Sequence, residues 1–431
     1  MLRTHSISRL FGFAFLAGLA SVSCGDDDDS TGTTAGASGK GGATSTGGKT
    51  STGGKTASGG SSGYAGTVSI AGTSNPMAGA PGEAGMGQGG AGGAPAGLSK
   101  AMVVQTNLVF GAPSGGAGGA GGEGAANLDP NLINAWGISF NPDPAVATMF
   151  WVSAADSGVS TVYAADGTPA PLVVTIPAAT ATDTGHPTGQ VFNTTTGFKG
   201  DKFIFATEDG LIAGWKTGTA AVAQADLSAD AASYKGLTLI EGADPMLVAA
   251  NFHAGTLDVF DKTYAAVTAP MFVDPKPIAG YAPFNVAALG DKVYVAYAKQ
   301  DADMADEVAG AGLGYVNSFN PDGSFDAHLI LRGGVLNAPW ALALAPAGFT
   351  PAPGALLVGD FGDGMIHGFD PSSGVLMFEF TDADGKPLAI DGLWGLTFGT
   401  KKTSADLSAK LFFSAGPAEE SQGLFGVLSA P

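Results

Sequence analysis

Apolar and polar residues alternate along the chain in a unit that recurs six times between Trp136 and the C-terminus. Each unit opens with a triplet that is aromatic, small and apolar in its clearest copies. An apolar stretch, an acidic or glycine-rich turn and a second apolar stretch follow. The triplets are Trp136-Gly137-Ile138, Thr188-Gly189-Gln190, Lys235-Gly236-Leu237, Phe284-Asn285-Val286, Trp340-Ala341-Leu342 and Trp394-Gly395-Leu396.

Successive triplets are 52, 47, 49, 56 and 54 residues apart. Repeats of about fifty residues with strand-like content are typical of β-propeller blades. β-Branched and aromatic residues between turn residues predict the strands of each blade. We expect second strands at 149–153, 202–206, 246–250, 292–296, 355–359 and 410–414, and third strands at 160–164, 211–215, 256–260, 314–319, 365–369 and 423–428. The pattern therefore predicts an all-β fold, a six-bladed propeller.

The end of the chain lacks a strand for its last blade. Residues 171–176 and 327–331 read as fourth strands, whereas the sixth blade stops after three at Leu428. The apolar run 102–110 precedes the first blade and has no other partner. We expect this run to form the outer strand of blade six, which closes the ring and covers its edge.

Composition separates the repeats from what precedes them. Residues 25–98 are mostly Gly, Ser, Thr and Ala, so they cannot bury enough apolar surface to fold and are predicted to form a disordered tether. All five tryptophans lie in the later part, which is large enough for one core. We expect three regions: a signal peptide at 1–23, a tether at 24–98 and a propeller at 99–431.

The N-terminus has the layout of an export signal. Two arginines precede the apolar run 10–19, which is shorter than the roughly 20 residues that span a bilayer. The run leads to Ala20-Ser21-Val22-Ser23 and to Cys24, the single cysteine. This segment resembles a bacterial lipoprotein box. The resemblance implies a lipid on Cys24 and an exported protein of the bacterial cell envelope, in the outer membrane or at the cell surface.

The formal net charge is −19 and the pI is near 4.4. Nucleic-acid binding needs a basic surface, so we expect no nucleic-acid partner. We expect a monomer that meets a membrane only through its lipid anchor. Its partner would be a small ligand or an envelope protein, and neither can be named from the residues.

Acidic residues concentrate in the turns between second and third strands. These turns contain eleven carboxylates against one lysine, and propeller geometry places them on one face with the loops that enter each blade. The candidate residues of this ligand-binding face are Asp156, His186, Glu208, Asp209, Asn251, His253, Lys299, Asp301, Asp303, Asp360 and Asp363.

Three interpretations of this face remain open. The carboxylates could accept backbone hydrogen bonds within tight turns. They could instead bind a hard cation such as Ca²⁺, for which Asp156, Glu208, Asp209 and Asp360 are the candidate ligands. A catalytic acid–base pair, assisted by His186 or His253, is the third. The longest turn, 299–314, lacks the ligand spacing of an EF-hand.

Several short sequences within the repeats resemble those of known propellers. The blades resemble those of NHL-type propellers, and residues 129–428 resemble a family of exported bacterial six-bladed propellers. These short sequences are Ala155-Asp156-Ser157-Gly158, Val259-Phe260-Asp261, Asp360-Phe361-Gly362-Asp363-Gly364, Asp129-Pro130-Asn131-Leu132, Phe205-Ala206-Thr207-Glu208-Asp209-Gly210, Tyr297-Ala298-Lys299-Gln300-Asp301-Ala302-Asp303 and Asp391-Gly392-Leu393-Trp394-Gly395-Leu396. The resemblance implies the fold and carries no assigned chemistry.

A binding role is favoured over catalysis. We expect an envelope-tethered propeller that presents its acidic face to a ligand or a protein. The alternative is a Ca-dependent hydrolase or lyase with its site at the channel mouth, by fold-level analogy alone. The tryptophans at the triplets recur at one repeat position, which favours a packing role over ligand stacking.

Overall fold

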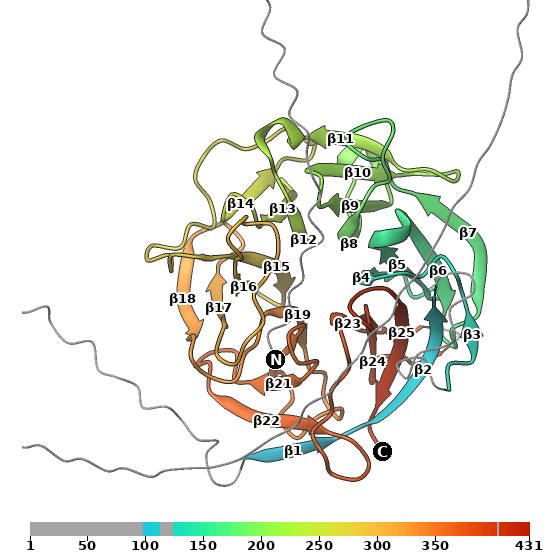
Figure 1. The fold of residues 1–431 in the computed structure, drawn as a ribbon, viewed down its shortest axis with the longest axis vertical. Coiled ribbons are helices and arrows are strands. Elements are labelled where there is room, and N and C mark those ends of the chain that lie inside the picture. The colour runs from blue at the N-terminus through green and yellow to red at the C-terminus, as the bar shows by residue number, and fades with distance from the viewer. Residues whose placement is uncertain (1–97, 113–123, 403–404) are drawn as a thin grey trace, which may run out of the picture. The chain divides into compact units, whose positions relative to one another are not determined.

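The computed structural model describes residues 98–112, 124–402 and 405–431. Six sheets, mainly antiparallel, surround a common axis, with their first strands innermost (Figure 1). The first three blades are β4 (Ala135–Ser139), β5 (Met149–Ala154), β6 (Val159–Ala164) and β7 (Pro169–Thr175); β8 (Pro187–Phe192), β9 (Phe203–Thr207), β10 (Leu211–Trp215) and β11 (Val222–Asp226); and β12 (Tyr234–Ile240), β13 (Met246–Asn251) and β14 (Thr256–Phe260).

The remaining blades complete the circle, which confirms the predicted six-bladed propeller. They are β15 (Tyr281–Leu289), β16 (Lys292–Lys299), β17 (Gly314–Phe319) and β18 (Phe325–Ile330); β19 (Pro339–Leu344), β20 (Leu356–Asp360), β21 (Ile366–Phe369) and β22 (Leu376–Thr381); and β23 (Leu393–Phe398), β24 (Lys410–Ala415) and β25 (Gly423–Ser429). In the described part of the chain, short 3-10 helices lie in loops at η2 (Ala155–Ser157), η3 (Phe198–Gly200) and η4 (Ser228–Asp230). The second and third strands match the predicted ranges to within a few residues.

The N-terminal strand closes the ring, as predicted. Strand β2 (Val104–Gly111) pairs antiparallel with β25, and the short β3 (Asn127–Leu128) pairs with its other edge. The sequence did not indicate a further contact, in which β1 (Ser99–Met102) pairs parallel with β22 of blade five. Val103, between β1 and β2, is fully buried. One continuous segment therefore links blade five to blade six by strand pairing.

Each triplet marks a bulge in an innermost strand. The pairing register between first and second strands shifts at the triplet in all six blades. The small second residue is needed because neighbouring inner strands meet there. A Cβ on Gly189 would lie 2.3 Å from the backbone nitrogen of Leu237, closer than any real side chain allows. Glycine at a bulge that approaches another backbone has this physical basis.

Apolar side chains fill each space between adjacent blades, and one further cluster lies on the axis. Leu356, Val358 and Phe369 of blade five, for example, pack against Val316 and Leu329 of blade four. Because both faces of every sheet are buried, the strands carry apolar residues on both sides. Among the residues described, no helix is long and apolar enough to cross a membrane.

Candidate functional site

Aromatic side chains plug the centre of the ring. The first triplet residues Trp136, Phe284, Trp340 and Trp394 come from four blades and are almost completely buried. Trp136 and Trp394 stack with their ring centroids 3.4 Å apart, and Trp340 meets both edge-on at 5.9 Å. Phe361 stacks on Trp394 at 4.0 Å. The tryptophans thus pack on one another along the axis.

Hydrogen bonds fix the plug to neighbouring blades. The Trp394 indole N–H donates to Asn134 Oδ1 (3.0 Å), and the Trp340 N–H donates to the Lys235 carbonyl across the ring (2.9 Å). The Ser414 hydroxyl donates to the Trp136 carbonyl. These two bonds matter because an unpaired N–H in a core is costly. The Trp136 indole N–H is also buried, but it has no hydrogen-bond partner among the described residues. The plug is therefore a rigid floor beneath the loop-lined mouth of the axis.

Lys235 occupies the triplet position that is aromatic in four other blades. The residue is only 2% exposed. Its Nζ lies 5.5 Å from the Trp136 ring centroid and 6.0 Å from that of Phe252. The ammonium pairs with Glu208 and lies 3.4 Å from Asp306 Oδ1. Burial by itself would lower the pKa of Lys235, but the surrounding carboxylates outweigh it and raise that pKa.

Two further carboxyl groups share this space. Burial raises the pKa of Glu307 to about 8, against the lowering effect of Lys235. Burial, and then the charge of Glu208, raises the pKa of Glu420 to about 7. The exposed Asp156 on η2 adds to the shift of Glu420. We call Asp156, Glu208, Lys235, Asp306, Glu307 and Glu420 the acidic mouth.

Strained backbone holds Glu420 in place. Ala418, Glu419 and Glu420 have φ angles of 55°, 56° and 64°, and Asn134 has φ of 51°. Non-glycine residues adopt this left-handed region at a cost, and such strain concentrates at functional sites. Asn134 donates to Glu420 Oε1 (3.1 Å) and also accepts from Trp394. The carboxyl group is thereby tied to the plug.

The raised pKa values predict that stability falls as pH rises. Glu307 and Glu420 titrate near 4.5 when unfolded but at about 8 and about 7 when folded, so between these values the folded protein binds more protons. We expect the melting temperature to decline from pH 5 to pH 8 by roughly 5 °C, and the Glu307→Gln/Glu420→Gln variant to flatten this decline. Thermal melts followed by circular dichroism test this. A melting temperature that rises over the same interval would contradict it, and Asp322→Asn on an exposed turn serves as control.

Four predicted face residues instead fasten turns. Asp209 Oδ2 accepts from the Ala179 N–H at 2.5 Å, and Asp363 Oδ2 accepts from the Asn337 side chain at 3.1 Å. Asn251 Oδ1 accepts from the backbone N–H of Ala254 in its own turn and from that of Ser233, just before β12. Asp301 Oδ1 accepts from the Ala305 and Asp306 N–H groups. Turn stabilisation, one of the three interpretations, describes these residues.

Four other candidates lie around the mouth without entering its charge cluster. His186 is partly exposed, and its carbonyl accepts from the Glu208 N–H at 3.1 Å. His253 is also partly exposed, and its carbonyl accepts from Gln300 Nε2 at 3.5 Å. Lys299 ends β16 and is partly exposed, whereas Asp303 is exposed at the tip of the longest turn.

Asp360 is not on the face at all. Its side chain is 0% exposed, between blades four and five, and its Oδ2 lies 3.3 Å from His367 Nε2. The other imidazole nitrogen lies 3.8 Å from Glu379 Oε1 on β22. Burial raises the pKa of Asp360 to about 7, with His367 opposing the shift. The expectation that Asp360 faces a ligand was therefore wrong, because its side chain points into the inter-blade core.

The four candidate Ca²⁺ ligands do not form one site, since Asp156 and Glu208 lie in the acidic mouth and Asp209 and Asp360 lie outside it. Glu208 pairs with Lys235, Asp209 bonds a loop, Asp360 is buried with His367 and Asp156 is exposed on η2. Over the described ranges, no group of three or more His, Cys, Asp or Glu side chains is arranged to hold a metal ion. The predicted lipidation site Cys24, the signal peptide and the tether lie outside the described residues.

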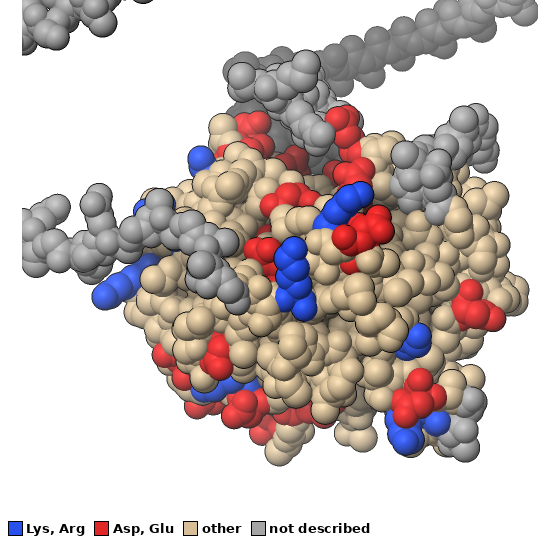
Figure 2. Space-filling model, turned by 90° about the horizontal axis from the view of Figure 1, so that it is seen from below, with Lys and Arg blue, Asp and Glu red and all other residues tan. Residues whose placement is uncertain are grey.

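Asp306, Glu307 and Glu420 were counted among the loop carboxylates but not named as candidate residues, and Lys235 and His367 were not predicted at all. Lys235 was visible as a charged residue at an otherwise aromatic repeat position, and that exception was the available signal. His367 had no such signal, because its partners Asp360 and Glu379 are brought to it by neighbouring strands. On the side that Figure 2 shows, charged side chains form small mixed groups on a largely uncharged surface.

The protein is a six-bladed β-propeller. Its N-terminal segment pairs with blades five and six, and aromatic side chains fill its axis. No family model matches the chain. Uncharacterized protein R648 of Acanthamoeba polyphaga mimivirus is 32% identical over 321 residues, which covers 70% of this chain and 76% of R648. Uncharacterized protein L690 of the same virus is 32% identical over 324 residues, covering 70% and 82%. The chain belongs to the same protein family as R648 and L690.

Solved structures with similar folds are more distant. An α-L-arabinofuranosidase from Fusarium graminearum has a TM-score of 0.49 at 9% identity, covering 76% of this chain and 98% of that one. A streptogramin B lyase has a TM-score of 0.42 at 11% identity, covering 70% and 96%. A fold shared at such identities says nothing about a shared activity.

The relatives correct the predicted localisation. Assignment to a bacterial cell envelope was wrong, because the matching proteins R648, L690 and R640 come from a virus of amoebae. That assignment rested on a short N-terminal pattern, whereas the matches to R648 and L690 each extend over 70% of the chain. The propeller part of the NHL-like resemblance is confirmed, and membership of an exported bacterial family stays a prediction.

Proposed function

We propose that this propeller is a non-catalytic binding module whose acidic mouth takes up a cationic group of a small ligand or a partner protein. One observation carries the proposal. The mouth already holds an ammonium group, that of Lys235, above two aromatic rings and between carboxylates. The same surroundings suit an ammonium or guanidinium supplied from outside.

The charges of the mouth are unbalanced. Five carboxyl groups face one ammonium, and the raised pKa values of Glu307 and Glu420 reflect that surplus together with burial. A bound cation would stabilise the ionised carboxylates and lower both pKa values. We therefore expect affinity for a cation to increase from pH 6 to pH 8.5, as the two glutamates ionise.

Rigidity supports binding as well. The aromatic plug closes the axis beneath the mouth, so a ligand approaches from the loop face alone. Asn134 ties Glu420 to the Trp394 indole, and Glu208 is held by Lys235. Groups that are placed before the ligand arrives lose little conformational freedom on binding.

A titration with the peptide trilysine tests the proposal. At pH 8.5 and low salt we expect the variant Glu307→Gln/Glu420→Gln to bind trilysine at least about tenfold more weakly than the wild type, because two carboxylates are lost from one site. The matched control is Asp322→Asn/Asp384→Asn, which removes the same charge from two exposed turns. Isothermal titration calorimetry gives the affinities.

The outcomes separate specific from general attraction. Equal weakening in both variants would mean that trilysine responds only to the net charge of the protein, and the proposal would fail. A CaCl₂ titration under the same conditions addresses the alternative. Heat that EDTA abolishes and that the mouth variant loses would favour a metal site over a site for organic cations.

A further inference from the structure

A hollow lies between blades two and three, on the opposite face from the acidic mouth. It has a volume of about 540 Å³ and is bounded by the β8–β9 loop, the β12–β13 loop and the turn after β14. This volume is within the range of small-molecule sites. Its lining residues are Thr194, Thr195, Thr196, Gly197, Glu241, Gly242, Ala243, Pro245 and Lys262.

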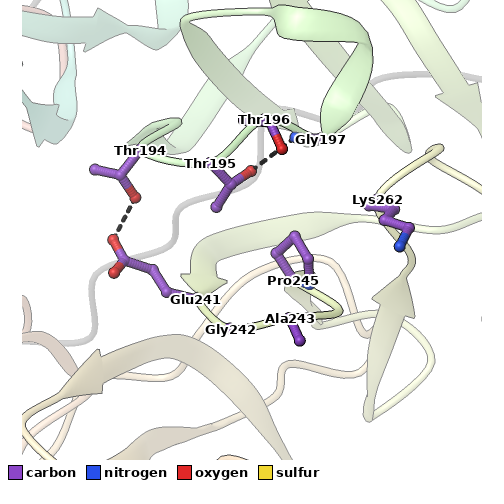
Figure 3. A pocket seen from close by; sticks show the side chains of 9 residues that line it. All are labelled: Thr194, Thr195, Thr196, Gly197, Glu241, Gly242, Ala243, Pro245 and Lys262. Atoms are coloured by element: carbon purple, nitrogen blue, oxygen red, sulfur yellow. Dashed lines mark hydrogen bonds between the residues drawn. The ribbon is translucent and has the colours of Figure 1, made fainter.

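The walls of this hollow are polar and carry both charges. Figure 3 shows Glu241 on one side and Lys262 on the other, with three successive threonines along the rim. The lining contains no aromatic residue and no large aliphatic residue. A flat or apolar ligand would find no stacking surface here. The chemistry fits a polar ligand that carries opposite charges.

The threonine wall is held from beneath by a buried amide. Asn193 Oδ1 accepts from the Thr195 N–H (2.9 Å) and hydroxyl (2.7 Å). Asn193 Nδ2 donates to the carbonyls of Gly197 (3.2 Å) and Asp201 (2.8 Å). Gly197 N–H in turn donates to the Thr195 hydroxyl (3.1 Å). The loop therefore keeps its shape without a ligand.

A direct contact joins the two walls. The Phe198 N–H donates to the Lys262 carbonyl at 2.6 Å, and the Phe198 ring meets Tyr264 edge-on at 5.3 Å. Phe198 and Lys199 adopt φ angles of 55° and 53°, a strained conformation that this docking maintains. The hollow is consequently preformed between two blades.

The Glu241 carboxylate and the Lys262 ammonium can each form further hydrogen bonds with a ligand. Glu241 Oε1 accepts from the Thr194 hydroxyl, which leaves its second oxygen without that bond. Lys262 Nζ donates to the exposed Asp244 at 2.9 Å, and an ammonium has two further N–H donors. A ligand ammonium can pair with Glu241 while a ligand carboxylate pairs with Lys262.

We infer that the hollow between blades two and three binds a zwitterion of the amino-acid or short-peptide class. The ligand ammonium would face Glu241, and its carboxylate would face Lys262 and the threonine hydroxyls. This inference does not depend on the acidic mouth, which lies on the other face and holds different residues.

Three related probes test both charges. Glycylglycine carries both, N-acetylglycylglycine lacks the ammonium and glycylglycinamide lacks the carboxylate. We expect the wild type to bind glycylglycine at least about tenfold more tightly than either analogue. Backbone amide shifts of Thr194–Gly197 and Gly242–Ala243 in NMR titrations give affinity and location together, with the amides of Glu307 and Glu420 as markers of the mouth.

Two charge variants assign the ends of the ligand. Glu241→Gln should abolish the preference for glycylglycine over its acetylated analogue and keep the preference over the amide. Lys262→Gln should do the reverse, and Lys386→Gln, an exposed lysine elsewhere, should change neither. Both target residues are exposed, so these variants are expected to fold. Equal binding of all three probes by the wild type, or shifts confined to the mouth, would overturn the inference.

Discussion

A chain that lacks residues 99–111 is expected to melt at a temperature at least about 10 °C below that of the intact chain, or not to fold at all. The deleted segment supplies β1 and β2, which pair with the outer edges of blades five and six. It also buries Val103, Leu108, Val109 and Phe110. Each such side chain contributes about 1.5–3 kcal/mol as an upper estimate, and the total is comparable to the whole stability of many domains.

Point variants separate ring closure from other effects of the deletion. Phe110→Ala should cost about 3–5 kcal/mol, because it opens a cavity between β2 and its neighbours. Gln105→Ala on the same strand is exposed and should change stability by less than about 0.5 kcal/mol. Thermal and urea melts followed by circular dichroism measure both. A deletion variant with the melting curve of the intact chain would mean that the N-terminal segment does not hold the ring together.

Glu208→Gln is expected to lower the free energy of unfolding by about 3 kcal/mol, because it leaves the Lys235 ammonium buried with Asp306 as its remaining close partner. Lys235 cannot move into water without leaving the space above Trp136 and Phe252. The double variant Lys235→Met/Glu208→Gln should recover part of the loss, since methionine fits the apolar surroundings and no charge remains unpaired.

The corresponding double-mutant cycle identifies the coupling between Lys235 and Glu208. The exposed pair Lys262–Asp244 gives a matched control, in which Asp244→Asn should cost at most about 1 kcal/mol. Urea unfolding at pH 8 and moderate salt is the appropriate measurement. If the losses of Lys235→Met and Glu208→Gln simply add, the two groups are not coupled and the description of the mouth is incorrect.

The strands and their number could be predicted because their causes are local or periodic. Turn residues and β-branched or aromatic runs placed β9, β10, β13 and β16 within a few residues of their observed bounds. The closing strand β2 could be predicted by counting, since blade six had three strands and one apolar run had no partner. The contact of β1 with blade five could not, because a four-residue strand carries too little pattern.

The orientation of the acidic side chains could not be predicted, and the reason is a single-residue offset. Thr207 and Asp360 occupy the same place in their blades, opposite Pro187 and Pro339 on the first strands. Side chains at this place enter the space between blades, whereas Glu208, one residue later, reaches the axis. Asp360 is the last residue of β20 and stays between two blades, whereas β9 ends at Thr207, so Glu208 lies in the turn and can point toward the axis.

Taken alone, the sequence determined the repeat, the six blades, the closing strand and the concentration of carboxylates in one set of loops. The repeat period and the turn residues depend on the order of residues along the chain, so both can be recognised in the sequence without the folded structure. The tertiary structure alone decided that the triplet aromatics meet on the axis, that Lys235 is buried beneath Glu208 and that Asp360 pairs with His367. Those contacts join residues from different strands and blades, and the bulge in each inner strand sets which side chains face one another.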